Sequence, residues 1–271
     1  MTIVLGVAAP DGLILAGDSR TSRRWTSGHH RIASDFASKV FEVCGFGIAT
    51  FGEALVDART IAGQVDEFIA TLQDRPADVD ELAAAVGDFF QDRVVRWYAA
   101  MGAPWDASQG FKLGFIVAGY GSDGIGGMRE VRVPGDPGPE IITLAPSTTD
   151  PGFYPRGQTD VIDRLIAGFD VQRLVAASVV VPDPVVQAIA GLEYAMIEPL
   201  ALQDAVDLAH FLIRTTIDMQ RFSDGTTAMP NVPPGCGGPI TMLAIRRRKT
   251  EWVDNHPLSK ASRPGWAEGS H

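Results

Sequence analysis

The first hydrophobic pattern of the chain predicts a β-hairpin. An apolar run at residues 3–9 leads into a Pro-Asp-Gly turn at residues 10–12, and a second apolar run at residues 13–17 ends in Asp18. Proline, aspartate and glycine favour a tight turn between two strands. Because paired strands of a hairpin are antiparallel, the end of the second strand returns to the start of the first. We therefore expect the Asp18 carboxylate to lie close to Thr2.

The pattern then alternates between strand and helix periods. After a polar loop at residues 19–38, apolar and polar residues alternate in a second hairpin at residues 39–44 and 46–51. From Glu53 to about residue 72, apolar residues recur every three or four positions, which predicts an amphipathic helix. A second helix with the same period is expected from about residue 80 to residue 97.

Strands, helices and two last strands follow in the second half. The predicted elements are strands at residues 112–120, 128–133 and 140–144, helices at about 158–168, 183–198 and 202–219, a loop at 221–235, and strands at 238–247 and 251–253. Residues 2–254 are interpreted as one domain, and residues 255–271 as a polar, mobile C-terminal tail. The last three residues are too few to decide whether they are native.

The order of these elements indicates the fold class. Runs of strands and runs of helices, in place of strict alternation, favour an α+β fold in which sheets are covered by helices. The strands are apolar throughout, so both sheets are expected to be buried. A four-layer αββα sandwich satisfies both conditions.

Composition removes several classes of function. The net charge of −10 argues against nucleic-acid or anionic-membrane partners, and the basic run at residues 246–249 is interpreted as the solvated end of a strand. No apolar run reaches the roughly 18 to 20 residues needed to span a bilayer. No signal peptide precedes the first hairpin, so a cytoplasmic location is expected. Cys44, Cys236 and the five histidines form no metal-binding or disulfide pattern, so we expect no metal and no cofactor.

Thr2 could have a reactivity that other threonines lack. An initiator Met1 before a small residue is normally removed, which would leave Thr2 with a free α-amine. A hydroxyl needs an adjacent base to act as a nucleophile, and the amine of the same residue can be that base. The alternative is that Thr2 is an ordinary β-branched residue that opens a strand.

Five short motifs resemble the proteasome β-subunit family of N-terminal nucleophile hydrolases. In chain order they read T-I-V-L-G-V, L-A-G-D-S-R-T, S-K-V-F-E-V, A-T-F-G-E-A-L-V-D-A and G-C-G-G-P-I. The resemblance covers roughly residues 2 to 254 and implies the αββα fold of that family.

The resemblance also implies roles for individual residues. It makes Thr2 the nucleophile, Asp18 its acidic partner, Lys39 the lysine between them, and Gly52 the backbone N–H donor of the oxyanion hole. Taken alone, Lys39 could be a strand-edge lysine and Gly52 a turn glycine. The positions implied to line the substrate groove and its first specificity pocket are Thr21, Ser22, Thr50 and Ala54.

Two departures from the family pattern set this chain apart. Where the family has G-S-G before a helix, residues 154–158 read Y-P-R-G-Q, and where it has D-x-x-S-G, residues 233–237 read P-P-G-C-G. Cys236, followed by Gly237, therefore stands at a serine position, either as a second nucleophile or as a small buried residue. These departures make the chain similar to the divergent, Anbu-type bacterial branch of the family.

The function implied is that of a threonine peptidase or amidohydrolase that acts on peptide or protein substrates through a Thr2 acyl ester. Two alternatives stay open: an amide ligase or transpeptidase on the same scaffold, and a catalytically silent scaffold protein. The resemblance further implies a homo-oligomer, as a ring or an open helical washer. The sequence leaves open the subunit number, the pocket specificity and whether an ATPase partner exists.

Overall fold

The computed structural model describes residues 2–24, 30–170, 183–191, 193–194, 199–226, 229–230 and 234–253. The tail predicted at residues 255–271 lies outside these ranges, as does residue 233 of the P-P-G-C-G segment.

Two five-stranded antiparallel sheets form the centre of the molecule. The first contains, in spatial order, β12 (Gly152–Gly157), β1 (Ile3–Ala9), β2 (Gly12–Asp18), β15 (Ile240–Arg246) and β16 (Lys249–Trp252). The second contains β11 (Glu140–Ala145), β10 (Gly126–Val133), β9 (Leu113–Tyr120), β6 (Phe46–Gly52) and β5 (Val40–Val43).

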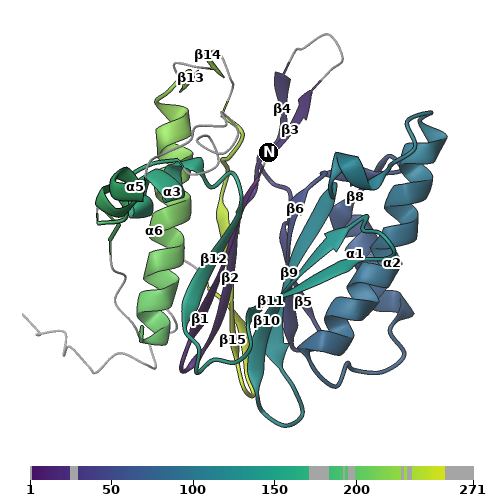
Figure 1. Ribbon diagram of the computed structural model, residues 1–271. Coiled ribbons are helices and arrows are strands. Elements are labelled where there is room, and N and C mark those ends of the chain that lie inside the picture. Colours follow the sequence, from purple (N-terminus) through teal and green to yellow (C-terminus); the bar gives the residue numbers. More distant parts are fainter. Residues whose placement is uncertain are drawn as a thin grey trace, which may run out of the picture.

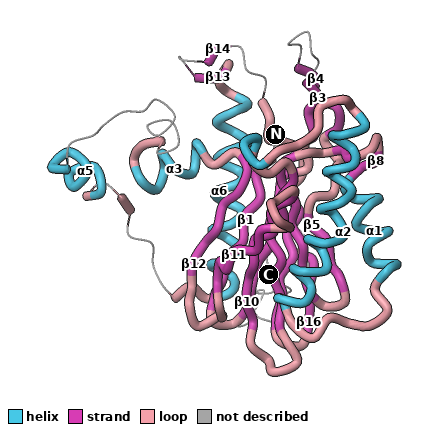
Figure 2. The backbone as a smooth tube through the Cα atoms, turned by 45° about the vertical axis from the view of Figure 1, so that its right-hand side comes forward, coloured by secondary structure: helices cyan, strands magenta, loops and turns pink. Residues whose placement is uncertain are grey.

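Helices cover the outer face of each sheet. The first sheet is covered by α6 (Leu202–Arg221), with α3 (Asp160–Ala167) beside it, and the second by α1 (Ile61–Thr71) and α2 (Val79–Ala100). A further helix, α5 (Asp183–Ala190), lies on the same side as α6, and a 3₁₀ turn, η1, spans Ala107–Gln109. The four layers are visible in Figure 1 and, from a second direction, in Figure 2. The predicted αββα sandwich is confirmed.

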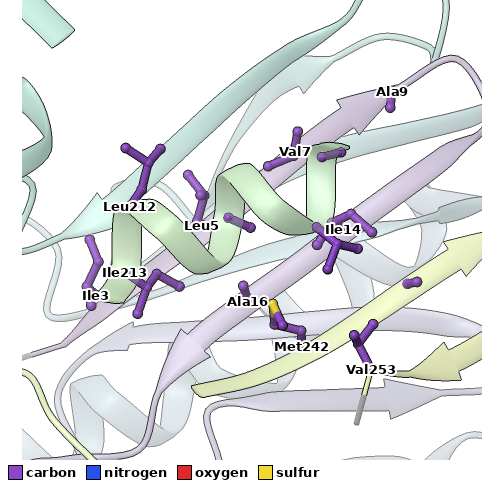
Figure 3. Close-up of a cluster of buried hydrophobic side chains, with 14 of the residues drawn as sticks. Ile3, Leu5, Val7, Ala9, Ile14, Ala16, Leu212, Ile213, Met242 and Val253 are labelled. Carbon is purple, nitrogen blue, oxygen red and sulfur yellow. The ribbon is translucent and has the colours of Figure 1, made fainter. Parts of the chain in front are cut away.

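Three apolar clusters hold the layers together. Between α6 and the first sheet, Leu212 and Ile213 pack over Leu5 and Ile14 (Figure 3). A matching cluster joins α1 and α2 to the second sheet. The third, which we call the inter-sheet core, contains Val4, Ala8, Leu13, Leu15, Val40, Ala49, Phe51, Ile116, Ala118, Tyr120, Met128, Ala145, Leu243 and Ile245. Because strand residues alternate between faces, β1 contributes Leu5 to one core and Val4 to the other.

The helix predicted from Glu53 begins only at Ile61. A small hairpin precedes it, made of β7 (Leu55–Val56) and β8 (Arg59–Thr60), and its turn residues Asp57 and Ala58 have positive φ. The apolar spacing of this segment fits a helix, but the left-handed turn interrupts the helical backbone. Thr60 then caps α1, because its hydroxyl accepts the Gly63 N–H.

Two predicted loops contain strands. The polar loop at residues 19–38 includes a hairpin of β3 (Thr21–Arg24) and β4 (His30–Ser34), and the loop at 221–235 includes β13 (Gly225–Thr226) and β14 (Met229–Pro230). Both pairs are short, and neither shows the apolar alternation on which the prediction depended.

In the second half of the chain, the structure contains one strand that was not predicted and one helix that ends earlier than predicted. The strand β12 was not predicted, since its Pro155 lowers strand propensity; it pairs only with β1, and proline is tolerated at such a sheet edge. The helix predicted to residue 198 ends at Ala190, and residues 195–198 lie outside the described ranges.

Replacement of Leu15 by alanine should strongly destabilise the fold. Leu15 is fully buried in the inter-sheet core, and truncation of a buried leucine typically costs about 2–5 kcal/mol of unfolding free energy. Urea denaturation of Leu15→Ala measures this loss. The control Ile141→Ala, at a side chain that is 41% exposed, should change the unfolding free energy by no more than about 0.5 kcal/mol. Equal effects of the two substitutions would contradict the assigned core.

Candidate active site

The first hairpin brings Thr2 and Asp18 together. Strands β1 and β2 pair with Val4 opposite Gly17, so the ends of the two strands meet. The backbone N–H of Ile3 donates to Asp18 Oδ1 at 3.0 Å. Thr2 is 8% exposed and Asp18 1% exposed. The predicted neighbourhood of these two residues therefore exists in the folded chain.

The Asp18 carboxylate is the centre of the site. Its Oδ1 accepts from Ile3 N and from Lys39 Nζ, the latter at 2.6 Å. Its Oδ2 accepts the backbone N–H groups of Arg20 at 3.1 Å and Gly237 at 2.9 Å. A buried carboxylate needs such donors, because its charge is costly away from water. Four donors from four segments of the chain thus fix its position.

Lys39 reaches Asp18 from the opposite sheet. It directly precedes β5, is 5% exposed, and donates from Nζ both to Asp18 and to the Arg20 carbonyl at 2.6 Å. Burial lowers the pKa of Lys39, and the Asp18 carboxylate opposes that decrease. The ammonium is therefore held charged by its partner in a site that otherwise favours the neutral amine.

A pair of glutamines lies on the other side of Thr2. The Gln158 backbone N–H donates to the Thr2 carbonyl at 2.7 Å, and the Gln158 side-chain oxygen accepts from Gln220 Nε2 at 2.9 Å. Gly157, before it, has φ of +90°, and a Cβ there would lie 2.0 Å from the Thr2 carbonyl oxygen. Only glycine fits this approach. The sequence marked Gln158 only as a departure from G-S-G, and nothing marked Gln220.

Cys236 is a buried member of this network. Its thiol donates to Gln158 Oε1 at 3.1 Å and its backbone N–H donates to Gln220 Oε1 at 2.8 Å. Burial raises the pKa of the Cys236 thiol, and the nearby Asp18 charge raises it further. A thiol that stays protonated is a poor nucleophile, so this environment favours the interpretation of Cys236 as a small buried residue.

Arg20 supports the site from the side of β3. Its guanidinium forms a bidentate ion pair with Asp35, through Nε at 2.6 Å and Nη2 at 3.0 Å. Its backbone carbonyl and N–H contact Lys39 and Asp18. The sequence placed Arg20 at the end of the first hairpin but gave it no role, because its partner Asp35 lies beyond an intervening hairpin.

Three other residues predicted for the site, Thr50, Gly52 and Ala54, lie in or directly after β6. The Thr50 backbone N–H donates to the Lys39 carbonyl at 2.9 Å, but the Thr50 hydroxyl bonds the Gly114 carbonyl. Gly52 ends β6 two residues later, with φ of +99°, and a Cβ there would lie 2.4 Å from the Lys112 carbonyl oxygen. Ala54 follows Gly52 in the turn to β7, half-buried.

Thr21 and Ser22 begin β3, directly after Arg20, and both are half-buried. The hairpin of β3 and β4 projects from the end of the sandwich at which β1 starts (Figure 1). Thr21 follows Arg20, whose carbonyl accepts from Lys39 Nζ, and is thereby brought near Lys39.

Two classes of site find no support in the described residues. Within those residues, no group of three or more histidine, cysteine, aspartate or glutamate side chains could hold a metal ion. Nor does any described helix combine the length and the apolar character that a membrane span requires.

Solved structures with a similar fold include Anbu proteins. The structure of a helical Anbu assembly from Pseudomonas aeruginosa matches with a TM-score of 0.58 and 15% identity, covering 94% of this chain and 88% of that chain. Anbu, described as an ancestral beta-subunit, from Yersinia bercovieri matches with a TM-score of 0.54 and 14% identity. The Anbu Gly-1 mutant from Hyphomicrobium sp. strain MC1 matches with a TM-score of 0.53 and 14% identity over the same shares.

No protein-family model and no curated protein matches the sequence. The comparisons therefore identify the fold. This chain has the fold of the Anbu structures, with the αββα sandwich that its motifs predicted.

Replacement of Lys39 by methionine should destabilise the protein, because it removes the cation from a buried pair. Loss of one partner of a buried ion pair typically costs about 3–5 kcal/mol of unfolding free energy, and the three N–H donors left on Asp18 should hold the loss near about 3 kcal/mol. The control Lys249→Met breaks an exposed pair with Glu251, which is worth less than about 1 kcal/mol. Denaturant titration compares the two variants. A loss for Lys39→Met no larger than that for Lys249→Met would show that the pair is not buried in solution.

Proposed function

We propose that this chain, which has the fold of the Anbu structures, is an N-terminal threonine hydrolase that cleaves amide bonds in peptide or protein substrates. The observation that carries the proposal is the contact set of Asp18, which joins the strand that begins after Thr2 to the ammonium of Lys39. Burying the two charges costs desolvation, and replacing both partners of a buried pair by apolar side chains is often neutral for stability, so the presence of the pair supports a chemical role.

The first step would be activation of the Thr2 hydroxyl. After removal of Met1, the Thr2 α-amine takes the proton of the Thr2 Oγ as Oγ attacks the substrate carbonyl carbon. The positive charge of Lys39 lowers the pKa of a neighbouring amine, so that more of the amine is neutral and can act as a base at neutral pH. Asp18 keeps Lys39 charged and positioned for this task.

The second part of the reaction concerns the charge that forms on the substrate. The carbonyl oxygen becomes an oxyanion, and the Gly52 backbone N–H would stabilise it, an interaction worth about 3–4 kcal/mol in comparable sites. The amine then returns its proton to the leaving nitrogen, and an ester forms on Thr2. Water hydrolyses the ester and restores the hydroxyl.

Self-association accompanies this function in our proposal. One of the similar structures is described as a helical assembly of the Anbu complex. In this chain, three large apolar side chains are at least half exposed at or next to α6: Phe211, Met219 and Phe222. Clusters of exposed apolar residues favour association, so we propose that copies of this chain form a ring or an open helical washer.

A catalytically silent scaffold is the second candidate. It is favoured by Gln158, whose amide stands next to Thr2 where the family resemblance implies a serine hydroxyl. Loss of that hydroxyl would weaken proton transfer at Thr2 but would leave the packing of the sandwich intact.

Electrophilic probes test whether Thr2 is a nucleophile. Intact mass should show the loss of Met1, and a peptide epoxyketone or vinyl sulfone should then add once to the wild-type chain. Thr2→Ala should not be labelled, because it lacks the hydroxyl, whereas Thr2→Ser, which retains one, should be. Equal labelling of wild type and Thr2→Ala, or permanent retention of Met1, would contradict the hydrolase and leave the scaffold.

The labelling rate should depend on pH with two limbs. The rate should rise as the Thr2 amine loses its proton, with a midpoint below the ordinary α-amine pKa of about 7.7–8, because Lys39 disfavours the charged amine. It should fall again as Lys39 loses its proton, because a neutral Lys39 no longer stabilises the negative charge that develops during attack by Thr2 Oγ. This midpoint should lie below the ordinary lysine value of 10.5, because burial lowers the pKa of Lys39. Mass spectrometry of labelling from pH 5 to pH 11 measures both limbs.

Lys39→Arg is the control for this assignment, since a guanidinium stays charged over the whole range. In a labelled Lys39→Arg chain the alkaline limb should disappear. An alkaline limb of unchanged midpoint in this variant would assign it to another group.

A further inference from the structure

A charged cluster lies inside the sandwich, apart from Asp18 and Lys39. Glu130 of β10 is 0% exposed and accepts from Arg132 Nε at 2.6 Å and from Arg156 Nε at 2.7 Å. Glu130 is two residues after Met128 of the inter-sheet core and therefore faces the space between the sheets. Arg132 belongs to the second sheet and Arg156 to the first, so the carboxylate joins the two sheets.

Strand register places this cluster close to both halves of the proposed reaction site. Arg156 pairs with Val4, two residues after Thr2 on the same face of β1. Arg132 pairs with Gly114, which in turn pairs with Phe51, the residue before Gly52. Arg156 therefore lies on the strand beside the start of β1, and Arg132 lies on β10, which β9 separates from the end of β6.

The cluster has more positive charge than its buried acid can neutralise. One carboxylate, on Glu130, faces two guanidinium groups. The other acidic partner is Glu140, which Arg132 contacts through Nη1 at 3.4 Å and which is itself 57% exposed. Surface pairs of that kind are weak. Water screens the exposed Glu140 charge, so at the buried end of the cluster two guanidinium groups are only partly neutralised by the one carboxylate of Glu130.

The two arginines also remain reachable. Side-chain exposure is 29% for Arg132 and 25% for Arg156, although both bond to a fully buried group. Arg156 Nη1 donates to the Pro155 carbonyl, and the Arg132 guanidinium lies over the Phe111 ring. Within the described part of the chain, Arg132 Nη2 has no acceptor. Arg132 Nη2 is therefore a fixed, partly exposed charged donor that is suited to hydrogen-bond a carboxylate.

We propose that Arg132 and Arg156, held in place by Glu130, form a subsite for a carboxylate group of the bound peptide, next to Thr2. The proposal rests on the proposed function, because it names the substrate class of that same site: peptides with an acidic side chain or with a free C-terminal carboxylate near the reacting bond. A purely structural role, in which the triad only joins the sheets, predicts no preference between charged and neutral ligands.

Equilibrium binding tests the subsite without requiring catalysis. Isothermal titration calorimetry compares two ligand pairs on the full chain: a tetra-alanine peptide with a free C-terminal carboxylate against its amide, and an internal glutamate peptide against its glutamine analogue. The proposal expects at least one charged ligand to bind about tenfold tighter than its neutral counterpart, as one charge-assisted hydrogen bond would give. The pair that shows the difference identifies the source of the carboxylate.

Variants assign the preference to the cluster. Arg156→Gln and Arg132→Gln should each reduce the preference to less than about threefold, since they remove one of the two guanidinium groups. Arg129→Gln is the matched control, because Arg129 lies in the same strand but pairs with Asp80 of α2 on the opposite face. It should keep the full preference. Thermal unfolding shows which variants are folded, and the wild-type comparison decides the question even if a cluster variant does not fold.

The outcomes separate this proposal from the proposed function. Thr2→Ala should retain the carboxylate preference, so a protein whose Thr2 resists electrophiles but which still prefers charged ligands has the subsite without the reaction. A chain whose Thr2 is labelled but which binds both members of each ligand pair equally overturns the subsite alone. Preference that survives in both arginine variants would also overturn it, because the charge would then come from elsewhere.

Discussion

The buried carboxylate of Asp18 is the constraint on which the candidate site depends. It accepts hydrogen bonds from β1, from the segments after β2 and before β15, and from Lys39 of the opposite sheet. Each donor lowers the cost of burying the charge, and none of the segments could move far without leaving that charge unsatisfied. The position of Lys39 relative to the start of β1 is therefore fixed by electrostatics as well as by apolar packing.

The same requirement explains the surroundings of the site. Cys236 and the two glutamines are neutral, hydrogen-bonded groups that fill the space beside Asp18 without adding charge. Had the cysteine been ionised, it would have competed with Asp18 for the single ammonium of Lys39. Burial prevents this by raising the pKa of the thiol. Lys39 is the only described residue whose cationic side chain bonds Asp18, and no ionised thiol competes with Asp18 for it.

Local signals in the sequence predicted much of the fold. The Pro-Asp-Gly turn and the apolar runs around it were sufficient for the β1–β2 hairpin, and helical periodicity was sufficient for α2 and α6. The sequence could not show the short hairpins, because their strands lack apolar alternation, or β12, because its partner β1 lies far along the chain. The roles of Gln220 and of the Glu130 cluster were not predicted either, because a polar residue in a helix or strand has no distinctive pattern until its partner is known. The proximity of Asp18 to Thr2 followed from the hairpin pattern, whereas the addition of Lys39 depended on a family resemblance, and the role of each remains a prediction.

Both the net charge of the whole chain and the individual charges near Thr2 affect which ligands the site can bind. The chain has a formal net charge of −10, which at long range repels an acidic peptide, although salt screens this field beyond a Debye length of about 8 Å at physiological ionic strength. Inside that distance only local charges matter. The cations of the candidate site are Lys39, paired with Asp18, and Arg20, paired with Asp35, and the proposed subsite adds the two arginines that share Glu130. The positive charge that is only partly neutralised therefore lies in the arginine cluster and not at the lysine. In the proposed reaction, Lys39 would lower the pKa of the Thr2 amine while a different pair of side chains would bind the carboxylate of the substrate.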